Sequence, residues 1–369
     1  MARQRALRQL LALLPLAAAG ALPAGAGELL YLSEGNRLRR IDIASIDAGP
    51  LRHEIFVERA ALDPARGRDL NGMHCALPDG SGRFVTGEDK GQPHPPAGFG
   101  VFDARGRQVG KLSAESEGSA DPYGCAFDGR GRLFTSDVGD PGRATGQLLL
   151  WFPPFDRFPG EPGAYPGTDA RSDHYCVLAS GIGTAGAVAI DARDRVYFAS
   201  SSRFAIYRFS PPFPSAPDAA GGCGERGPGG SARASRQERE VFARGPATFS
   251  GLAFAPNGNL YAASVATGRI YEYDPGGALV RRILVPSEWL PPFATGHPQG
   301  LAVDSQGTLY YADLDLRFGA AMPRPGPDGK LRRIRFDARG EPQAPEVVLA
   351  GLAFPDAVSV LPGELGAPQ

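Results

Sequence analysis

The stretch Leu301-Ala-Val-Asp-Ser-Gln-Gly-Thr-Leu-Tyr310 decides the fold. A short apolar segment leads through a Gln-Gly turn to an aromatic residue nine positions on, and Leu309-Tyr310-Tyr311-Ala312 opens a second apolar segment. Gly, Asn and Asp tolerate the positive φ of tight hairpins, so this pattern predicts two antiparallel β-strands joined by a turn. The same arrangement recurs four times: Cys75–Phe84, Cys125–Phe134, Val188–Tyr197 and Leu252–Tyr261.

Each repeat continues into two further short strands. Third strands are exemplified by Gln147–Phe152 and Arg269–Tyr273, and a fourth, outer strand by Glu346–Ala350. Four short antiparallel strands in each repeat are typical of the blades of a β-propeller. The sequence therefore predicts an all-β fold.

The two ends of the chain complete the blade count. Phe354–Val360 matches a sixth first strand, whereas Leu30–Glu34 and Arg37–Asp42 match a second and a third strand with no first strand of their own. We therefore expect the C-terminal strand to complete the N-terminal blade and to close a six-bladed ring, which removes the open sheet edges.

The composition agrees with a large folded domain. Of the 369 residues, 42% are hydrophobic and 21% are charged, and the formal net charge is −1. These values exclude a disordered or collagen-like chain, and they argue against a strongly basic nucleic-acid-binding surface. The 50 glycines and 35 prolines lie between the apolar runs, as many short turns require.

The first 26 residues resemble a secretory signal peptide. Three arginines within the first eight residues precede an apolar run over residues 10–22, and small residues at 24–26 supply a cleavage site. The apolar run is too short to span a membrane, and no later stretch reaches that length. We expect cleavage near Ala26 and one exported propeller domain over residues 27–369, periplasmic or secreted, with no membrane span.

Four cysteines in an exported chain predict disulfides. We favour a bond between Cys176 and Cys223, which fall on the hairpin side of adjacent blades, the latter in the insertion 211–237. Cys75 and Cys125 occupy equivalent positions in neighbouring inner strands. We expect their separation to exceed slightly the roughly 7 Å that bridging allows, so buried thiols stand as the alternative to a bond.

The propeller topology gathers polar residues at one central mouth. The loops that enter the first strands share a face with the loops between second and third strands. The entrance loops contribute Asn71, His74, Asp121, Tyr123, His297, Gln299 and Asp356, and the other loops contribute Glu34, Glu88, Asp137 and Asp313. Carboxylates and imidazoles at a concave mouth indicate a ligand or cation site. Asp137 and Asp313 are instead expected to cap turns.

The repeats resemble NHL-type repeats and the senescence-marker-protein/gluconolactonase-like six-bladed propellers. Three stretches carry the resemblance: Ser250–Phe254 with Asn257–Tyr261, Pro298–Asp304 and Thr308–Asp313. It covers essentially all of the chain after residue 26. The resemblance implies the fold, and propellers of this kind act as hydrolases, binding modules or scaffolds.

The gluconolactonase-like resemblance further implies calcium at the mouth, where it would polarise a lactone carbonyl and help to activate water. In those enzymes the ligands lie two residues before the repeat position of three blades. The six corresponding residues here are Met73, Tyr123, Gly186, Ser250, Gln299 and Asp356. Asp356 is the one carboxylate and Gln299 offers an amide, so the family's ligand triad is not preserved. A metal site would need Asn71, Asp121, Glu34 or a histidine.

Two functions follow as hypotheses. The first is recognition of a small polar ligand or protein partner at the mouth, through Asn71, Asp121, Tyr123, Gln299, Glu34 and Glu88. The second is a calcium-dependent lactone or ester hydrolase with Asp356 as a metal ligand and His74 or His297 as the base. A scaffold that uses the insertions 153–173 and 211–237 is a third alternative. No nucleotide-binding or serine-nucleophile motif appears.

Overall fold

The computed structural model describes most of the chain after residue 26. The described residues are 27–58, 70, 72–88, 98–112, 121–138, 145–153, 155, 175–224, 234–235, 237–245, 248–317 and 324–363. The expected signal peptide and most of the insertion 153–173 lie outside them. None of the helices within these ranges is long and apolar enough to cross a membrane.

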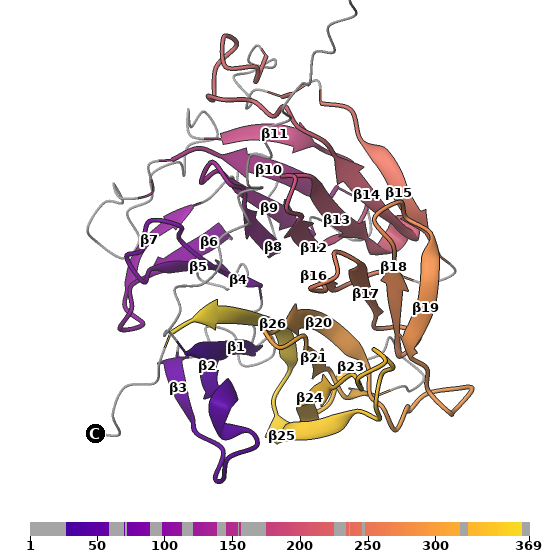
Figure 1. The fold of residues 1–369 in the computed structure, drawn as a ribbon. Coiled ribbons are helices and arrows are strands. Elements are labelled where there is room, and N and C mark those ends of the chain that lie inside the picture. Colours follow the sequence, from indigo (N-terminus) through magenta and orange to yellow (C-terminus); the bar gives the residue numbers. More distant parts are fainter. Residues whose placement is uncertain are drawn as a thin grey trace, which may run out of the picture.

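Six four-stranded antiparallel sheets form a ring, which confirms the six-bladed propeller (Figure 1). The first strand of each sheet lies innermost, so that β4, β8, β12, β16, β20 and β26 surround the centre. Blade 1 consists of β26 (Pro355–Pro362), β1 (Glu28–Glu34), β2 (Arg37–Asp42) and β3 (His53–Glu58).

The other five blades follow in chain order, each from its inner to its outer strand. Blade 2 contains β4 (His74–Ala76), β5 (Phe84–Glu88), β6 (Gly98–Phe102) and β7 (Gln108–Leu112); blade 3, β8 (Pro122–Phe127), β9 (Leu133–Asp137), β10 (Gln147–Trp151) and β11 (Tyr175–Ala179); blade 4, β12 (Ala185–Ile190), β13 (Val196–Ser200), β14 (Ala205–Phe209) and β15 (Glu240–Arg244); blade 5, β16 (Leu252–Phe254), β17 (Leu260–Ser264), β18 (Arg269–Tyr273) and β19 (Leu279–Leu284); blade 6, β20 (Pro298–Val303), β21 (Leu309–Asp313), β24 (Gly329–Ile334) and β25 (Glu346–Leu352). The described residues also form a small hairpin, β22 (Leu316–Arg317) with β23 (Arg324–Pro325), and the short 3₁₀ helices η1 (Ile43–Ser45) and η3 (Ser201–Arg203).

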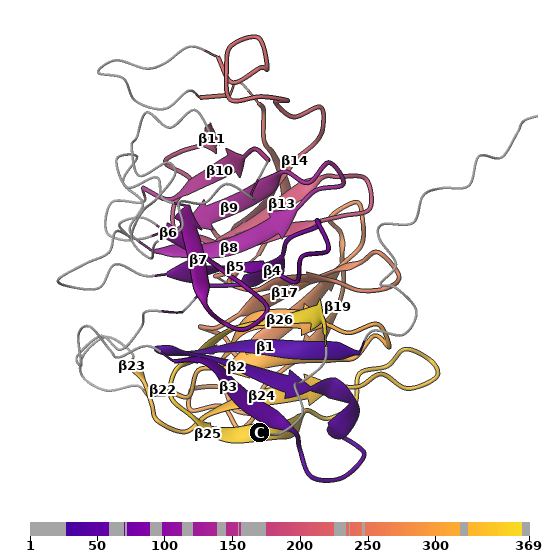
Figure 2. The same cartoon turned by 90° about the vertical axis from the view of Figure 1, so that its left-hand side faces the viewer.

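The C-terminal strand closes the ring, as predicted. β26 pairs antiparallel with β1, with Val358 opposite Leu32 and Val360 opposite Leu30. Beyond this ladder, the Gly363 N–H donates to the Gly27 carbonyl at 2.9 Å. Figure 2 shows β26, β1, β2 and β3 as successive strands of this blade. Blade 1 is thus built from both ends of the described chain.

The repeat aromatics form the packing between blades. They lie on the second strands as Phe84, Phe134, Tyr197, Tyr261 and Tyr310, and all five are buried. Tyr197 of blade 4 contacts Phe254 of blade 5 edge-on at 5.2 Å between ring centroids, and Phe84 of blade 2 lies 5.4 Å from Tyr31 of blade 1. Second strands are buried on both faces, so their apolar runs are nearly continuous.

Aspartates shape hairpin turns within the blades, as in the turn from β12 to β13 and the turn from β18 to β19. The Asp191 carboxylate accepts hydrogen bonds from the N–H groups of Arg193 and Arg195, both at 2.9 Å. Asp274 does the same for Gly276 and Ala278, also at 2.9 Å. Each carboxylate satisfies two backbone donors that the turn would otherwise leave without a protein partner.

We expect Asp274→Ala to lower the free energy of unfolding by about 1–2 kcal/mol, because two backbone donors lose their acceptor. Asp274→Asn should cost much less, since its amide oxygen keeps the acceptor. Urea denaturation of the three proteins checks this. Equal losses in both variants would show that the turn does not depend on the side-chain acceptor.

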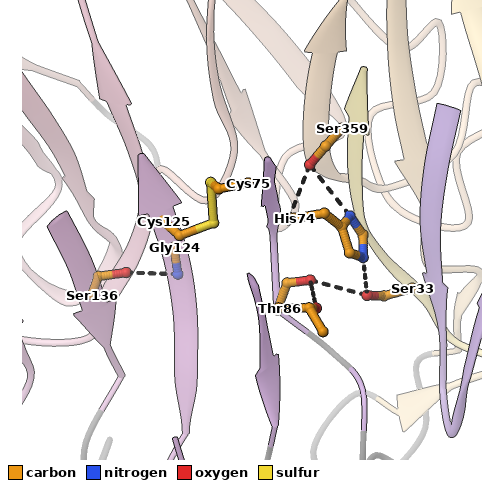
Figure 3. Close-up of a disulfide and its surroundings, with 9 residues drawn as sticks. Ser33, His74, Cys75, Thr86, Gly124, Cys125, Ser136 and Ser359 are labelled. Atoms are coloured by element: carbon orange, nitrogen blue, oxygen red, sulfur yellow. Dashed lines mark hydrogen bonds between the residues drawn. A yellow bond between two sulfur atoms is a disulfide. The ribbon is translucent and has the colours of Figure 1, made fainter. Parts of the chain in front are cut away.

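Both disulfides form. Cys176–Cys223 is confirmed, with 5.7 Å between the Cα atoms. The expectation that Cys75 and Cys125 are too far apart is wrong: their Cα atoms are 6.1 Å apart and the pair is bonded (Figure 3). Equivalent positions on β4 and β8 come within bridging range because the inner strands converge on the ring axis, where the Met73 N–H donates to the Tyr123 carbonyl at 2.7 Å.

Candidate functional site

A cavity of about 230 Å³ opens at the mouth of the ring. Six residues lie two positions before the repeat position of their blades, and five of these six line the cavity: Tyr123, Gly186, Ser250, Gln299 and Asp356. The sixth, Met73, packs into the core instead. These side chains come together because side chains alternate along a strand, so the same register in successive inner strands directs them to the same side.

Tyr123 reaches across the mouth. It enters from blade 3, yet its hydroxyl donates to the Asp356 backbone carbonyl of blade 1 at 3.5 Å. Burial raises the pKa of Tyr123 well above its usual value, and the Asp356 carboxylate raises this pKa further. A hydrogen bond with Gln299 of blade 6 lowers it in part. Asp121 adds a further upward contribution to this pKa. The phenol therefore stays protonated and donates to the Asp356 backbone carbonyl.

A glycine allows Gln299 and Asp356 to share one wall. Gly300 follows Gln299 on β20, and a Cβ atom there would lie 2.7 Å from the Asp356 carbonyl oxygen and 2.8 Å from the Ala357 Cα. A larger residue would force β20 away from β26. The close approach of these strands brings residues of blades 6 and 1 to the same cavity.

The remaining lining is largely apolar. Val138, Phe249, Val265 and Leu314 are among the apolar residues, and Ser201 and Thr184 add hydroxyls. Among the described residues that line the cavity, none is Lys, Arg or His. A small, largely apolar cavity with a few polar groups is the usual form of a small-molecule site.

His74 lies outside this lining. It is buried at the seam of the ring, with Nε2 3.0 Å from the Ser33 hydroxyl and Nδ1 3.3 Å from the Ser359 hydroxyl (Figure 3). The Ser33 hydroxyl donates its proton to the Gly72 carbonyl, so it accepts from Nε2–H, and Nδ1 accepts from Ser359. Burial lowers the pKa of His74 to about 3, which keeps the ring neutral.

His297 is also buried, one layer behind the cavity wall. Its Nδ1–H donates to the carbonyl of Val265, a lining residue, at 2.9 Å. Its backbone N–H donates to the Asp313 carboxylate at 2.8 Å, and Asp313 also accepts from the Asp315 N–H at 3.2 Å, as expected of a turn cap. Both histidines therefore occupy structural positions, buried and hydrogen-bonded outside the cavity lining.

The two glutamates expected at the mouth are buried and bonded elsewhere. Glu34 accepts two hydrogen bonds from Arg39, at 2.7 and 3.0 Å. Both oxygens of Glu88 lie within 3.3 Å of the Gln108 amide. Neither lines the cavity. Asn71 lies outside the described residues. Four of the predicted site residues thus meet at the cavity: Asp121, Tyr123, Gln299 and Asp356.

The described donors alone do not make up a calcium site. Within the described part of the chain, no three His, Cys, Asp or Glu side chains gather closely enough to hold a metal ion. The cavity lining supplies two carboxylates, whereas Ca²⁺ takes six to eight oxygen ligands, among which protein carboxylates are prominent. Calcium at Asp356 stays a prediction.

The apolar wall was missed by the sequence reasoning. Phe249 and Phe354 lie in entrance loops, and Val138, Val265 and Leu314 follow the ends of second strands. The latter three share one place in the repeat, immediately after the second strand. This shared position in the repeat could have predicted that Val138, Val265 and Leu314 line the cavity.

Many solved structures match this fold: 579 chains do so. A chain of the nidogen/laminin complex is 14% identical, with a TM-score of 0.53, over 90% of this chain and 98% of that one. A protein of unknown function from Bacteroides caccae is 11% identical, with a TM-score of 0.50, over 91% and 99%. A gluconolactonase from Xanthomonas campestris is 14% identical, with a TM-score of 0.46, over 75% of each chain. No protein-family model and no curated protein sequence matches. The first two likenesses, with TM-scores of 0.53 and 0.50, agree with the propeller fold and show the fold alone.

Proposed function

We propose that this protein binds a small polar ligand in the partly polar cavity at the mouth of its six-bladed propeller. The observation that carries the proposal is the convergence of Tyr123, Gln299 and Asp356, from three different blades, on one cavity. Hydrogen-bonding groups on an otherwise apolar wall would orient a ligand, while the apolar surface would contribute binding energy. The disulfides, which are typical of oxidising compartments, support binding outside the cytoplasm.

The competing hypothesis, a calcium-dependent lactone or ester hydrolase, is supported less well. It would need a general base within hydrogen-bond reach of a bound substrate. His74 and His297 are both buried and lie outside the cavity lining. Recognition of a protein partner at the same mouth is the other alternative, and it predicts that no small compound of the panel below changes the Tm.

Thermal unfolding with a panel of small compounds tests the proposal. The panel contains sugars, amino acids, small carboxylic acids, amines, lactones and calcium chloride. A ligand at 100 times its dissociation constant adds about 2.7 kcal/mol to the stability of the folded state, which raises the Tm measurably. We expect one compound class to raise the Tm of the purified protein.

The cavity is tested by filling it. Ser201→Trp, on η3 in the lining, should reduce the affinity for any such compound at least tenfold. Arg203→Trp places the same side chain on an exposed position of the same helix, outside the lining, and should leave the affinity unchanged. A Tm that no compound changes, or equal losses in the two variants, would contradict binding in this cavity.

A further inference from the structure

Large apolar side chains are exposed along one segment of blade 5, from β19 into the loop that joins β19 to β20. Nine large hydrophobic residues are exposed in the described part of the chain, and five of them lie here: Leu279, Val280, Val285, Trp289 and Leu290. Trp289 is 89% exposed and Leu290 76%, whereas the other seven lie between 42% and 51%. We call these two residues the loop tip. Apolar side chains that gather on a surface in this way mark a site of contact with a protein or a membrane.

The loop over residues 285–296 is held at its base by blade 6. The Arg332 guanidinium donates to the Ala294 carbonyl at 3.0 Å, and the Tyr311 hydroxyl donates to the Thr295 carbonyl at 2.8 Å. The loop tip therefore projects from a segment that hydrogen bonds fix to the ring.

The charge beside the loop tip is positive. Arg282 on β19 is exposed and forms no ion pair with a described residue, whereas its neighbour Arg281 is paired twice. Glu288 is the loop's one acidic residue, and it is turned back onto the loop, where its carboxylate accepts a hydrogen bond from the Ala294 N–H at 3.2 Å.

A second arginine lies at the point where the loop packs on blade 5. Gly268 is covered by the loop, since a Cβ atom there would lie 2.5 Å from Phe293 and 2.8 Å from Pro286. Arg269 follows directly at the start of β18, and within the described ranges it too has no ion-pair partner, while its Nε is buried without a hydrogen bond. Two positive charges thus accompany the apolar loop tip.

We propose that the loop tip inserts into the surface of an anionic phospholipid membrane, with Arg282 and Arg269 meeting lipid phosphates. Tryptophan favours the headgroup level of a bilayer, where its ring is removed from water and its N–H keeps a polar partner. Apolar side chains flanked by cations complement a surface that is negative outside and apolar beneath. A protein partner would need a pocket shaped to the loop tip, whereas a bilayer deforms around it. None of these residues lines the cavity, so this surface is separate from the ligand site.

The protein carries its own reporter for this contact. The sequence has two tryptophans, and Trp151 is 1% exposed, so a fluorescence change on mixing with vesicles comes from Trp289. We expect vesicles of phosphatidylcholine and phosphatidylglycerol in equal parts to shift its emission to shorter wavelength and to protect it from acrylamide. Vesicles of phosphatidylcholine alone should do so much more weakly. Brominated acyl chains should quench the emission, because the ring then lies in the bilayer.

Variants of the apolar residues locate the contact. Trp289→Ser/Leu290→Ser should lower the affinity for the anionic vesicles at least tenfold in sedimentation measurements. Ile55→Ser/Val347→Ser removes two exposed apolar side chains from the outer strands β3 and β25 of other blades, and it should leave the affinity unchanged.

A charge variant tests the arginines. Arg282→Gln should weaken binding to the anionic vesicles about fivefold, and high salt should weaken the binding of the parent protein. Arg193→Gln removes an exposed positive charge from the turn between β12 and β13 and should change neither.

Three results would overturn the proposal. Trp289 emission that neither kind of vesicle changes, or vesicle binding that Trp289→Ser/Leu290→Ser retains, would show that the loop tip does not enter a membrane. Equal affinity for both kinds of vesicle would show that the proposed lipid class is wrong. Emission that shifts with protein concentration alone, together with a dimer in analytical ultracentrifugation, would assign the loop tip to a contact between two copies of the chain instead.

Discussion

Between pH 7 and pH 5, the free energy of unfolding is expected to fall by about 2 kcal/mol because of His74 alone. The folded protein holds this imidazole neutral, with its pKa lowered by burial from 6.5 to about 3. In the unfolded chain the same group binds a proton below about pH 6.5. Over the window from pH 6.5 to about 3 the unfolded state thus binds more protons, so stability is present at neutral pH and is lost on acidification.

Urea denaturation at half-unit steps from pH 7.5 to 5 measures this slope. The limiting slope for one such group is about 1.4 kcal/mol per pH unit. His74→Asn keeps a polar group near Ser359 but does not titrate, so we expect a flatter profile with some loss of stability at pH 7. His53 on β3 also titrates with a lowered pKa, but it is present in both proteins. Parallel profiles for the two proteins would contradict the assignment.

Removal of the Cys75–Cys125 bond is expected to lower the free energy of unfolding by about 4 kcal/mol. The bond joins residues 50 positions apart, and its loss gives the unfolded chain the conformational freedom of that whole segment. It also links the inner strands of blades 2 and 3 directly. The double variant Cys75→Ala/Cys125→Ala, compared with the parent by urea denaturation, measures this loss.

The second disulfide provides a matched comparison. Cys176 and Cys223 are separated by 47 residues, so the chain-entropy account predicts a similar loss for Cys176→Ala/Cys223→Ala. A loss below about 1 kcal/mol in the Cys75/Cys125 variant would mean that the ring holds β4 and β8 together without the bond. Mass spectrometry under non-reducing conditions confirms which bond is present in each protein.

The blade pattern was predictable because each repeat encodes its own local structure. The turn aspartates, the aromatic nine positions on and the small residues of the inner strand act within one blade, and the structure places each of them as expected. Ring closure was predictable from the strands missing at one end and present at the other. The Cys75–Cys125 bond was not, because it depends on the distance between neighbouring blades, which no local pattern specifies.

The site was predictable only in part, for a reason of strand geometry. Asp121, Tyr123, Gln299 and Asp356 were assigned to the mouth, and they line the cavity. His74 occupies the position just before the repeat residue, so alternation along the strand turns its side chain away from the side that Tyr123 and Asp356 face. Glu34 shows a different limit: its partner, Arg39, lies across the hairpin, and a sequence does not show which carboxylate an arginine will neutralise.

The shared blade also sets an order of events during synthesis. β1 leaves the ribosome before the other described strands, and its partner β26 leaves after them. Until then, the edge of β1 that β26 later covers presents unpaired backbone groups, which is the kind of surface that recruits strands from other chains. Pairing across almost the whole sequence also carries a large loop-closure cost and folds slowly. A nascent chain of this protein therefore exposes this edge of β1 until β26 has been synthesised.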